Sequence, residues 1–337
     1  MTSPYPGQKT AVNVVLGTMT FAAPGTSHAR VTDLKDVEAI IDIFLSHGHR
    51  ELDAARWYGY GTNEVYLGQI DWKSKGVLME TKLWPVSPEM SFIGDHSPAN
   101  IRKFCQMSLD ALKTDLLEMW YLHGPDRHNP YEDTLRAVNE LYKEGKFKRF
   151  GISNYMSWEV AEICGICERN GWVKPSVYQG LYNAVHRAVE PELFPCLRKF
   201  GIAFYGFNPI GGGFFTGRYS NSTDEAESTS RFHGEGRTSV LYRKRYWQQP
   251  YFDGLNKISS AAEKYGLTMI EVALRWTMHH SLMKREFGDA VLIGASSVAH
   301  IEQNLEDLEK GPLPQEVVNA LDGAWAGVKG IATNYFH

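Results

Sequence analysis

Short apolar runs alternate with amphipathic segments along the whole chain. Apolar residues recur with helical spacing over eight segments, residues 32–47, 63–70, 98–113, 131–144, 157–170, 191–199, 251–265 and 298–308. Eight further runs are typical of strands: NVVLGTM (13–19), ELDAA (51–55), VLMETKL (77–83), LEMWYLH (117–123), RFGISN (149–154), SVYQGLYN (176–183), GIAFYGFN (201–208) and AVLIGAS (290–296). Near-continuous apolar strands separated by helices indicate a parallel sheet that helices cover.

Two architectures fit eight strand–helix units, an open doubly wound sheet and a closed barrel. No Pro- or Ser-rich linker and no break in composition divides the 337 residues, which favours a barrel. We therefore expect a single (β/α)8 TIM-barrel domain over residues 1–337, with a C-terminal helix and tail at 312–337. Residues 210–250 depart from the regular pattern, and a loop this long is usually a functional lid or a disordered insert. Its aromatic and arginine content favours a lid.

The composition argues against several classes of protein. A formal net charge of −4 leaves no basic excess to displace counterions, which argues against a general nucleic-acid binder. No apolar run reaches the roughly 18 residues of a membrane span, and the first residues lack a charged segment followed by a long apolar one. We expect a cytoplasmic protein with no nucleic-acid or membrane partner. The sequence leaves the oligomeric state open, a homodimer included.

Two of the four cysteines form a C-x-x-C pattern. Cys164 and Cys167 lie three residues apart in an amphipathic segment, and no second Cys/His pair with ligand spacing follows. A zinc site of the common kind needs four ligands. We therefore expect no metal and interpret both thiols as facing a core, while a redox role stays open.

Polar side chains stand where successive predicted strands end. They are Asp53 and Tyr58 after the second strand, Lys82 in the third, His123 in the fourth, Ser153 and Asn154 in the fifth, Gln179 in the sixth, and Asn208, followed by Pro209, in the seventh. Each residue alone has an ordinary explanation, such as a snorkelling lysine or a helix cap. Their recurrence at the C-terminal ends of the strands, where barrel enzymes carry their chemistry, favours an active site.

This set of residues can tune a proton donor. A tyrosine with its ordinary pKa of about 10 is a weak acid at neutral pH, and a nearby ammonium stabilises its phenolate. A carboxylate paired with that ammonium limits the cost of burying it. Asp53, Lys82 and Tyr58 would then form a tuned acid, and His123 would be a second donor to a carbonyl oxygen. Protonating that oxygen while hydride reaches the carbon is carbonyl reduction.

The motifs that contain these residues resemble those of the aldo-keto reductases. They are LDAARWYG (52–59), TKLW (81–84), YLHGPD (121–126), GISNY (151–155), VYQGLYN (177–183) and FNPIGGGFFTGRY (207–219). Further motifs are similar to the aflatoxin-aldehyde reductase branch: ELFPCLRKFG (192–201), YRKRYW (242–247) and LIGASSVAHIEQNL (292–305). The resemblance implies a barrel with NADPH or NADP⁺ across the C-terminal face and a small carbonyl substrate. It also implies that Tyr58 is the acid, that Lys82 lowers its pKa, that Asp53 pairs with Lys82 and that His123 orients the substrate.

The cofactor residues come from the same resemblance. No G-x-G-x-x-G follows the first strand, so a Rossmann fold would lack its phosphate turn. The residues implied at the nicotinamide are Asp53, Ser153, Asn154, Gln179 and the stacking Phe207. Those implied at the pyrophosphate are Asn208, Pro209, Ile210, Gly211, Gly212, Gly213, Thr216, Gly217 and Arg218, and those at the 2′-phosphate and adenine are Ser296, Ser297, Gln303 and Asn304. The residues at the 2′-phosphate lie at and on the predicted helix 298–308. This helix has no acidic residue in its first turn to bind a ribose diol, which favours NADPH over NADH.

The expected substrate contacts are Trp57, Trp84, His123, Tyr242, Arg245 and His337. The tryptophans favour an aromatic or otherwise apolar carbonyl, although ordinary packing explains them equally well. Relatives end in an arginine that meets acidic substrates, whereas this sequence ends in NYFH. Because an ordinary histidine is mostly neutral at pH 7, a preference for acidic aldehydes is in doubt.

Two other functions fit part of the pattern. One is an NADPH-binding regulatory barrel with little turnover, as in the similar potassium-channel β subunits. The other is an aldolase or isomerase that uses Lys82 for a Schiff base. The complete set of four catalytic residues favours turnover, and the sequence does not define the physiological substrate or its pathway.

Overall fold

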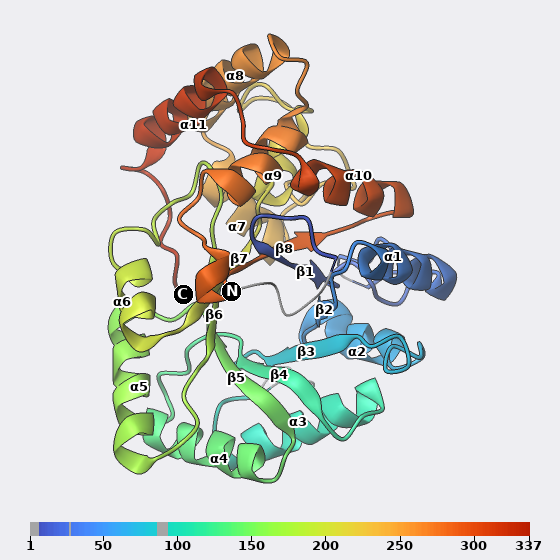
Figure 1. Cartoon of the computed structure of the whole chain (residues 1–337), viewed down its shortest axis with the longest axis vertical. Helices are drawn as coiled ribbons and strands as arrows, with labels where there is room; N and C mark the ends of the chain where they lie inside the picture. The colour runs from blue at the N-terminus through green and yellow to red at the C-terminus, as the bar shows by residue number, and fades with distance from the viewer. Residues whose placement is uncertain (1–6, 27, 86–93) are drawn as a thin grey trace.

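Eight parallel strands close into a barrel (Figure 1). The computed structural model describes residues 7–26, 28–85 and 94–337. The strands are β1 (Asn13–Gly17), β2 (Glu51–Asp53), β3 (Leu78–Leu83), β4 (Leu117–Leu122), β5 (Phe147–Ser153), β6 (Val177–Leu181), β7 (Ala203–Phe207) and β8 (Ala290–Gly294). Each strand pairs with the next in chain order, and β8 returns to pair with β1. The expected (β/α)8 barrel is confirmed.

Helices surround the barrel and extend beyond it. The α-helices are α1 (Leu34–Ser46), α2 (Thr62–Leu67), α3 (Pro98–Leu112), α4 (Tyr131–Lys143), α5 (Ser157–Asn170), α6 (Leu193–Phe200), α7 (Arg237–Tyr246), α8 (Gln249–Glu263), α9 (Met269–His279), α10 (Val298–Glu309) and α11 (Gln315–Val328). Short 3₁₀ helices are η1 (Tyr58–Gly61), η2 (Gly211–Thr216) and η3 (Arg285–Phe287). The eight helical segments predicted from the pattern are present, with ends that differ by a few residues.

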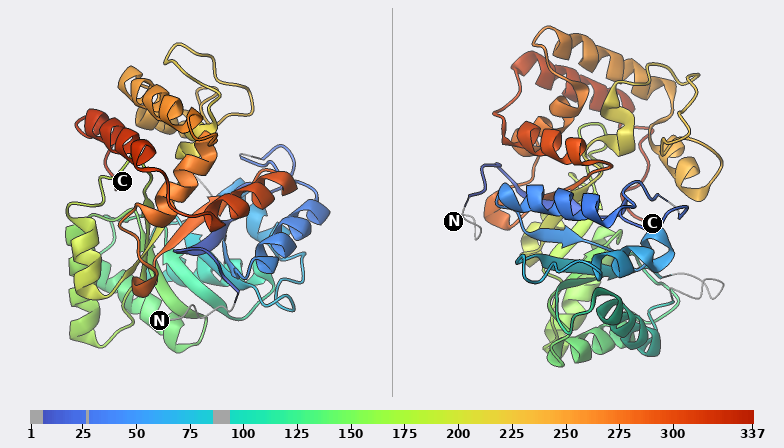
Figure 2. Two further views of the ribbon diagram at one scale, coloured as in Figure 1. Left: turned by 45° about the horizontal axis from the view of Figure 1, so that its top comes forward. Right: turned by 90° about the vertical axis from the view of Figure 1, so that its right-hand side faces the viewer.

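Both α8 and α9 lie between β7 and β8, where the sequence pattern predicted a helix only over residues 251–265. The corresponding α8 packs mainly against α11, and the two form a pair outside the barrel (Figure 2). The helix beside α10 is α9, which the pattern missed. It begins where the Thr268 hydroxyl accepts from the Glu271 N–H. Both segments are amphipathic, so periodicity could not decide which one faces the strands.

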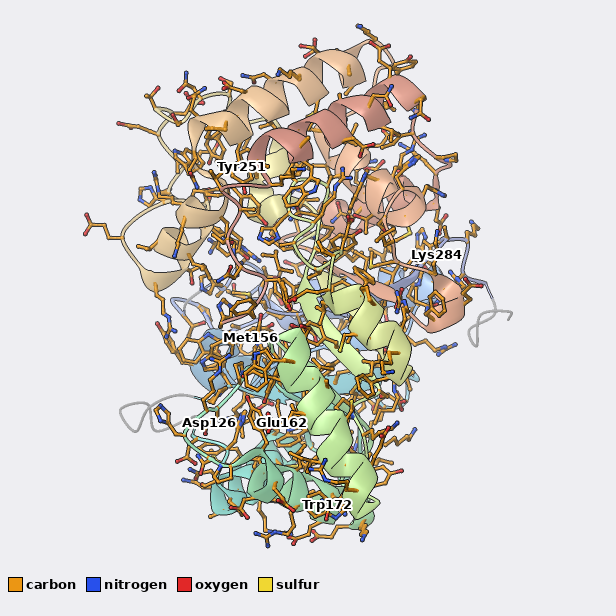
Figure 3. All side chains as sticks on the ribbon, turned by 90° about the vertical axis from the view of Figure 1, so that its left-hand side faces the viewer. Asp126, Met156, Glu162, Trp172, Tyr251 and Lys284 are labelled. Atoms are coloured by element: carbon orange, nitrogen blue, oxygen red, sulfur yellow. The ribbon has the colours of Figure 1, made fainter. Side chains whose placement is uncertain are left out.

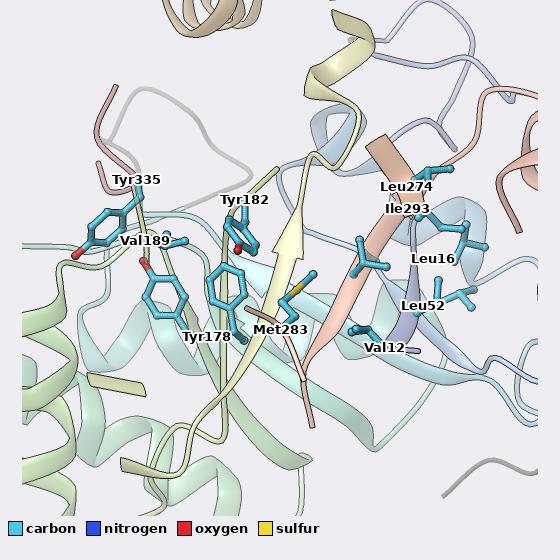
Figure 4. Close-up of a cluster of buried hydrophobic side chains, with 14 of the residues drawn as sticks. Val12, Leu16, Leu52, Tyr178, Tyr182, Val189, Leu274, Met283, Ile293 and Tyr335 are labelled. Carbon is cyan, nitrogen blue, oxygen red and sulfur yellow. The ribbon is translucent and has the colours of Figure 1, made fainter. Parts of the chain in front are cut away.

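Strands and ring helices share a continuous apolar core. Figure 4 shows Leu16, Leu52 and Ile293, which come from three neighbouring strands, close to Leu274 of α9. All four are at most 2% exposed. Burial of this kind stabilises a fold by roughly 25 cal/mol per Å² of apolar surface. The core therefore holds the strand ends, and the side chains on them, in fixed positions.

The segment 210–250 is folded rather than structureless. It contains η2 and α7, and three of its own aromatic side chains form a cluster: Tyr219, Phe232 and Trp247. The Trp247 indole also donates to the Ser222 carbonyl at 2.9 Å. The aromatic residues that favoured a lid in the sequence are thus the residues that pack this segment.

The C-x-x-C thiols face the core, as expected. Cys164 and Cys167 are both fully buried on α5, and burial raises the pKa of each to about 12. Across the described ranges, no three His, Cys, Asp or Glu side chains are grouped as a metal site requires. Nor does any helix within those ranges have the length and apolar character to cross a membrane.

Candidate active site

A buried ion pair joins the ends of β2 and β3. The Lys82 ammonium donates to Asp53 Oδ1 at 2.6 Å and to the Ala54 carbonyl at 2.7 Å. From β6, Gln179 Nε2 donates to the same Asp53 oxygen at 2.8 Å. Lys82 is 0% and Asp53 1% exposed, and a buried charge is costly unless it is paired. Each member of the pair therefore stabilises the other in the interior.

Tyr58 approaches this pair from the loop after β2. Its N–H donates to the Ala55 carbonyl at 3.1 Å, and the chain then turns through Gly59 at a φ of 55°. A Cβ on Gly59 would lie 2.5 Å from the Ala22 Cβ, so this turn requires glycine. The turn places the Tyr58 ring centroid 5.1 Å from Lys82 Nζ.

The pKa of the Tyr58 phenol lies well above its ordinary value. Burial is the largest cause, and Asp53 and Tyr242 raise the pKa further, whereas Arg231 lowers it. The resemblance implied that Lys82 lowers this pKa, and its ammonium, 5.1 Å from the ring centroid, acts in that direction. Lys82 is bonded to Asp53, whose opposite charge acts on the same phenol. The phenol is therefore protonated at neutral pH, which is the state that a proton donor needs.

His123 faces Tyr58 from the end of β4. The two rings meet edge to face with centroids 5.8 Å apart, and Trp84 packs edge to face on His123 at 5.1 Å. Burial first, then the charges of Lys82 and of His337, holds the pKa of His123 well below its usual value. A neutral imidazole can donate one hydrogen bond to a carbonyl oxygen. The four predicted catalytic residues thus lie together at the C-terminal end of the barrel.

The residues expected at the nicotinamide surround one unsatisfied acceptor. Asn154 has a φ of 66°, and its side-chain nitrogen donates to the His123 carbonyl at 2.8 Å and to Ser153 Oγ at 2.9 Å. Its Oδ1 is buried with no donor among the described residues. A buried acceptor of this kind fits the amide nitrogen of a carboxamide. Since one N–H of the Gln179 amide donates to Asp53, its second N–H and its oxygen are the groups that could meet a ligand.

The glycine-rich loop after β7 is packed beneath α7. Phe207 ends the strand at the barrel interior, and Asn208 has a φ of 68° and donates to Tyr246 Oη at 2.9 Å. A Cβ on Gly212 would lie 2.1 Å from the Tyr242 ring, so the close packing of loop and helix requires glycine there. Arg218, expected at the pyrophosphate, forms an exposed ion pair with Glu227 at 2.7 Å.

The start of α10 has its free N–H groups beside two serines. Ser297 is the N-cap and accepts from the His300 N–H, while Ser296 Oγ lies 2.8 Å from His300 Nδ1. On the same helix, Gln303 Nε2 donates to Asp307 at 3.1 Å and Asn304 Nδ2 donates to the Gly294 carbonyl at 3.3 Å. Sequence reasoning missed His300, although its place four residues after Ser296 on a helix start could have indicated it.

The expected substrate residues divide into an aromatic and a basic group. Trp84 meets the His337 ring edge to face at 5.9 Å, and Trp57 is half-buried directly before Tyr58. The Tyr242 ring lies between two guanidinium groups, with Arg231 at 5.4 Å and Arg245 at 5.7 Å from its centroid.

Arg245 is only 4% exposed, and its Nε has no acceptor among the described residues. Sequence reasoning missed Arg231, which lies in the long segment and donates to Tyr242 Oη at 2.8 Å. Eleven positions separate it from Tyr242, and no repeating pattern in that stretch marks the contact.

One class of barrel oxidoreductases is defined by its fold and its site together. The fold is a (β/α)8 barrel, and the site has an acid, an amine, a phenol and an imidazole at the C-terminal ends of the strands. Residues 13–326 match the aldo/keto reductase family. The chain is 46% identical over 336 residues to aldo-keto reductase pigE of Monascus ruber, with 98% of both chains covered. It is 42% identical over 316 residues to human aldo-keto reductase family 7 member A3, covering 91% of this chain and 94% of that one. It is 41% identical over 331 residues to human aflatoxin B1 aldehyde reductase member 2, covering 96% of this chain and 89% of that one.

The chain therefore belongs to the aldo/keto reductase family. It is an oxidoreductase that acts on carbonyl compounds with a nicotinamide cofactor, and it is similar to the aflatoxin aldehyde reductases.

Proposed function

We propose that this enzyme reduces aldehydes or ketones to alcohols with NADPH and that Tyr58 donates the proton. The main support is the buried Asp53–Lys82 pair, whose ammonium lies 5.1 Å from the ring of a protonated phenol. The neutral His123, whose ring meets that phenol edge to face, supplies a second donor. Two neighbouring donors suit a carbonyl oxygen.

The proposed reaction follows from this placement. NADPH, when bound, supplies a hydride to the carbonyl carbon. His123 donates a hydrogen bond to the carbonyl oxygen and orients it, and the proton of Tyr58 moves to that oxygen, which completes the alcohol. Lys82 then lies next to the phenolate that is left on Tyr58 and stabilises its charge. Asp53 and Gln179 keep the ammonium in place.

The residues present fit a nicotinamide dinucleotide. The orphaned Asn154 Oδ1 would accept from the carboxamide, and the Phe207 ring would stack on the nicotinamide. The N–H groups of η2 would meet the pyrophosphate. Ser296, Ser297 and the start of α10 would bind the 2′-phosphate, because a helix N-terminus favours an anion.

We expect a preference for NADPH over NADH of at least about tenfold, since a charge-assisted phosphate contact contributes roughly 1.5–3 kcal/mol. Fluorescence titration of both cofactors measures it. Ser297→Asp provides the matched variant, because aspartate caps a helix as well as serine does but repels the phosphate. That variant should lose affinity for NADPH much more than for NADH. Equal Kd values for the two cofactors in the wild type would contradict the placement at Ser296 and Ser297.

For the substrate, we propose neutral aromatic or bulky carbonyls, dialdehydes or carbonyls of secondary metabolites. Trp57 and Trp84 supply apolar contact area, and two of the relatives named above are an aflatoxin aldehyde reductase and pigE. Burial, Arg245 and Arg237 lower the pKa of His337 to about 4. This imidazole is thus neutral at pH 7 and gives an acidic substrate no charge, so we propose that succinic semialdehyde is a poor substrate.

His337→Arg should raise kcat/KM for succinic semialdehyde about tenfold and leave benzaldehyde nearly unchanged, because only the acid gains a charge-assisted contact. In the wild type, kcat/KM for succinic semialdehyde should stay constant between pH 8 and about pH 6. It should rise only as the pH falls toward the His337 pKa of about 4, since protonation restores a cation. Steady-state kinetics of both proteins across this range measures the effect. An unchanged value for the acid in the variant would show that His337 does not meet the substrate's charge.

The proposed function itself is tested by incubating the purified protein with NADPH and an aromatic aldehyde. We expect many turnovers per protein, seen as loss of cofactor absorbance. Cofactor binding without turnover across a panel of aldehydes, dialdehydes and ketones would instead indicate a regulatory barrel. Trapping of the substrate on Lys82 by borohydride would indicate Schiff-base chemistry.

A further inference from the structure

The tail after α11 is anchored on the C-terminal face of the barrel. Tyr335 is 5% exposed and lies near Tyr178 of β6 (Figure 4). Its hydroxyl donates to Glu192 Oε1 at 2.5 Å and accepts from the Ser157 N–H at 3.1 Å. Two residues later, the His337 N–H donates to the Asn154 carbonyl at 3.2 Å. The tail is thus tied to the loops after β5 and β6.

A single arginine completes this anchoring. Arg127 Nη1 donates to the main-chain oxygen of His337 at 2.9 Å. Its other nitrogens, Nε and Nη2, donate to the two carboxylate oxygens of Glu159 at 2.8 and 3.1 Å. Glu159 is fully buried and also accepts from Tyr131 Oη and from the Met156 N–H. The guanidinium is therefore held in one orientation by a fixed carboxylate.

Arg127 itself lies away from the catalytic residues. It sits in the loop between β4 and α4, directly after Asp126, which is labelled in Figure 3. Its side chain is 44% exposed. It contacts the catalytic pocket through His337 and has no direct bond to Tyr58 or His123.

The residue that Arg127 holds is part of the pocket wall. The His337 ring packs edge to face on Trp84 at 5.9 Å, and Trp84 packs on His123 at 5.1 Å. His123 in turn meets Tyr58 at 5.8 Å. A continuous row of rings thus runs from the tail to the proton donor. The position of its outer ring, that of His337, depends on how firmly the tail is anchored.

We propose that Arg127 is a positioning residue that sets substrate specificity by fixing His337 as a wall of the pocket. This inference rests on the proposed carbonyl reduction at the same site. Large aromatic carbonyls reach the wall and depend on it, whereas a two-carbon aldehyde reacts at Tyr58 without reaching His337. The anchoring therefore affects the KM of large substrates and leaves the chemical step unchanged.

Arg127→Met should raise KM for an aromatic aldehyde such as 2-naphthaldehyde about 2- to 12-fold, the size of one lost aromatic contact. Its kcat, its Kd for NADPH and kcat/KM for acetaldehyde should stay at wild-type values. Arg127→Lys should recover part of the effect, because a lysine can still donate to the His337 oxygen. Tyr335→Phe, which releases the tail without touching Glu159, should reproduce the change in KM. Arg136→Met is the matched control, since Arg136 pairs with Asp133 on the surface of α4 and has no contact with the tail.

A double-mutant cycle separates positioning from general damage. If Arg127 acts through His337, Arg127→Met should add nothing to KM in a His337→Ala background. Additive effects, or an equal fall in kcat for both aldehydes, would overturn the proposal. If Arg127→Met fails to fold, the same cycle with Tyr335→Phe gives the answer.

A second measurement does not depend on turnover. Hydrogen exchange of residues 333–337 should be faster in Arg127→Met and in Tyr335→Phe than in the wild type and in Arg136→Met. Unchanged exchange would overturn the anchoring. A wild type that reduces no carbonyl would refute the proposed function, while the exchange result would still report on the tail.

Discussion

Tyr58→Phe should lower kcat for aldehyde reduction by about 10²–10⁴-fold, the usual contribution of a positioned proton donor. The phenylalanine keeps the ring that meets His123 edge to face, so only the hydroxyl is lost. The Kd for NADPH, measured by fluorescence titration, should stay within about twofold, since none of the expected cofactor contacts uses this phenol. Loss of turnover with intact cofactor binding would assign proton donation to Tyr58.

The control for this substitution is Tyr142→Phe, which removes a hydroxyl from a tyrosine that is 40% exposed on α4. It should leave kcat and KM unchanged. Turnover of Tyr58→Phe near the wild-type rate would mean that another group, His123 above all, protonates the product. The proposed mechanism would then be wrong, although the family assignment would stand.

Lys82→Met should be nearly inactive and less stable than the wild type. Removing the ammonium leaves the Asp53 carboxylate buried with only Gln179 and without its charged partner. Breaking a buried pair in this way typically costs about 3–5 kcal/mol. Since Asp53 already raises the pKa of Tyr58, the unopposed carboxylate should make the phenol a still weaker acid. Thermal denaturation and single-turnover kinetics measure the two effects.

The double substitution Asp53→Asn with Lys82→Met separates stability from chemistry. It removes both charges, so most of the lost thermal stability should return. Activity should not return, because no ammonium is left to stabilise the phenolate. A double variant that reduces aldehydes at the wild-type rate would show that Tyr58 works without this ion pair.

The structure adds groups that oppose the effect of the Lys82 ammonium on Tyr58. Burial, Asp53 and Tyr242 raise the pKa of the phenol, whereas a nearby ammonium that stabilises the phenolate acts in the opposite direction. The net shift of this pKa is upward. The sequence could not reveal this, because the direction of a pKa shift depends on burial and on the summed charges around a group.

The gathering of the candidate site residues was predictable because of how a parallel barrel is built. All its strands point the same way, so polar residues at the ends of separate strands must meet at one mouth. Up to 126 positions of sequence separate Asp53, Lys82 and Gln179. Nevertheless, Lys82 and Gln179 both donate a hydrogen bond to Asp53. Their placement needed only the recognition of each strand.

The sequence by itself determined the eight apolar strands, their parallel order and the residues at their C-terminal ends, since continuous apolar runs can be buried on both faces only in such a sheet. Tertiary packing decided which of two amphipathic segments, α8 or α9, covers the barrel, because periodicity defines an apolar face and not its partner. It also brought Arg231 next to Tyr242 and Arg127 to the main chain of His337. These contacts join loops and a tail that follow no repeating pattern, and only the folded chain places them together.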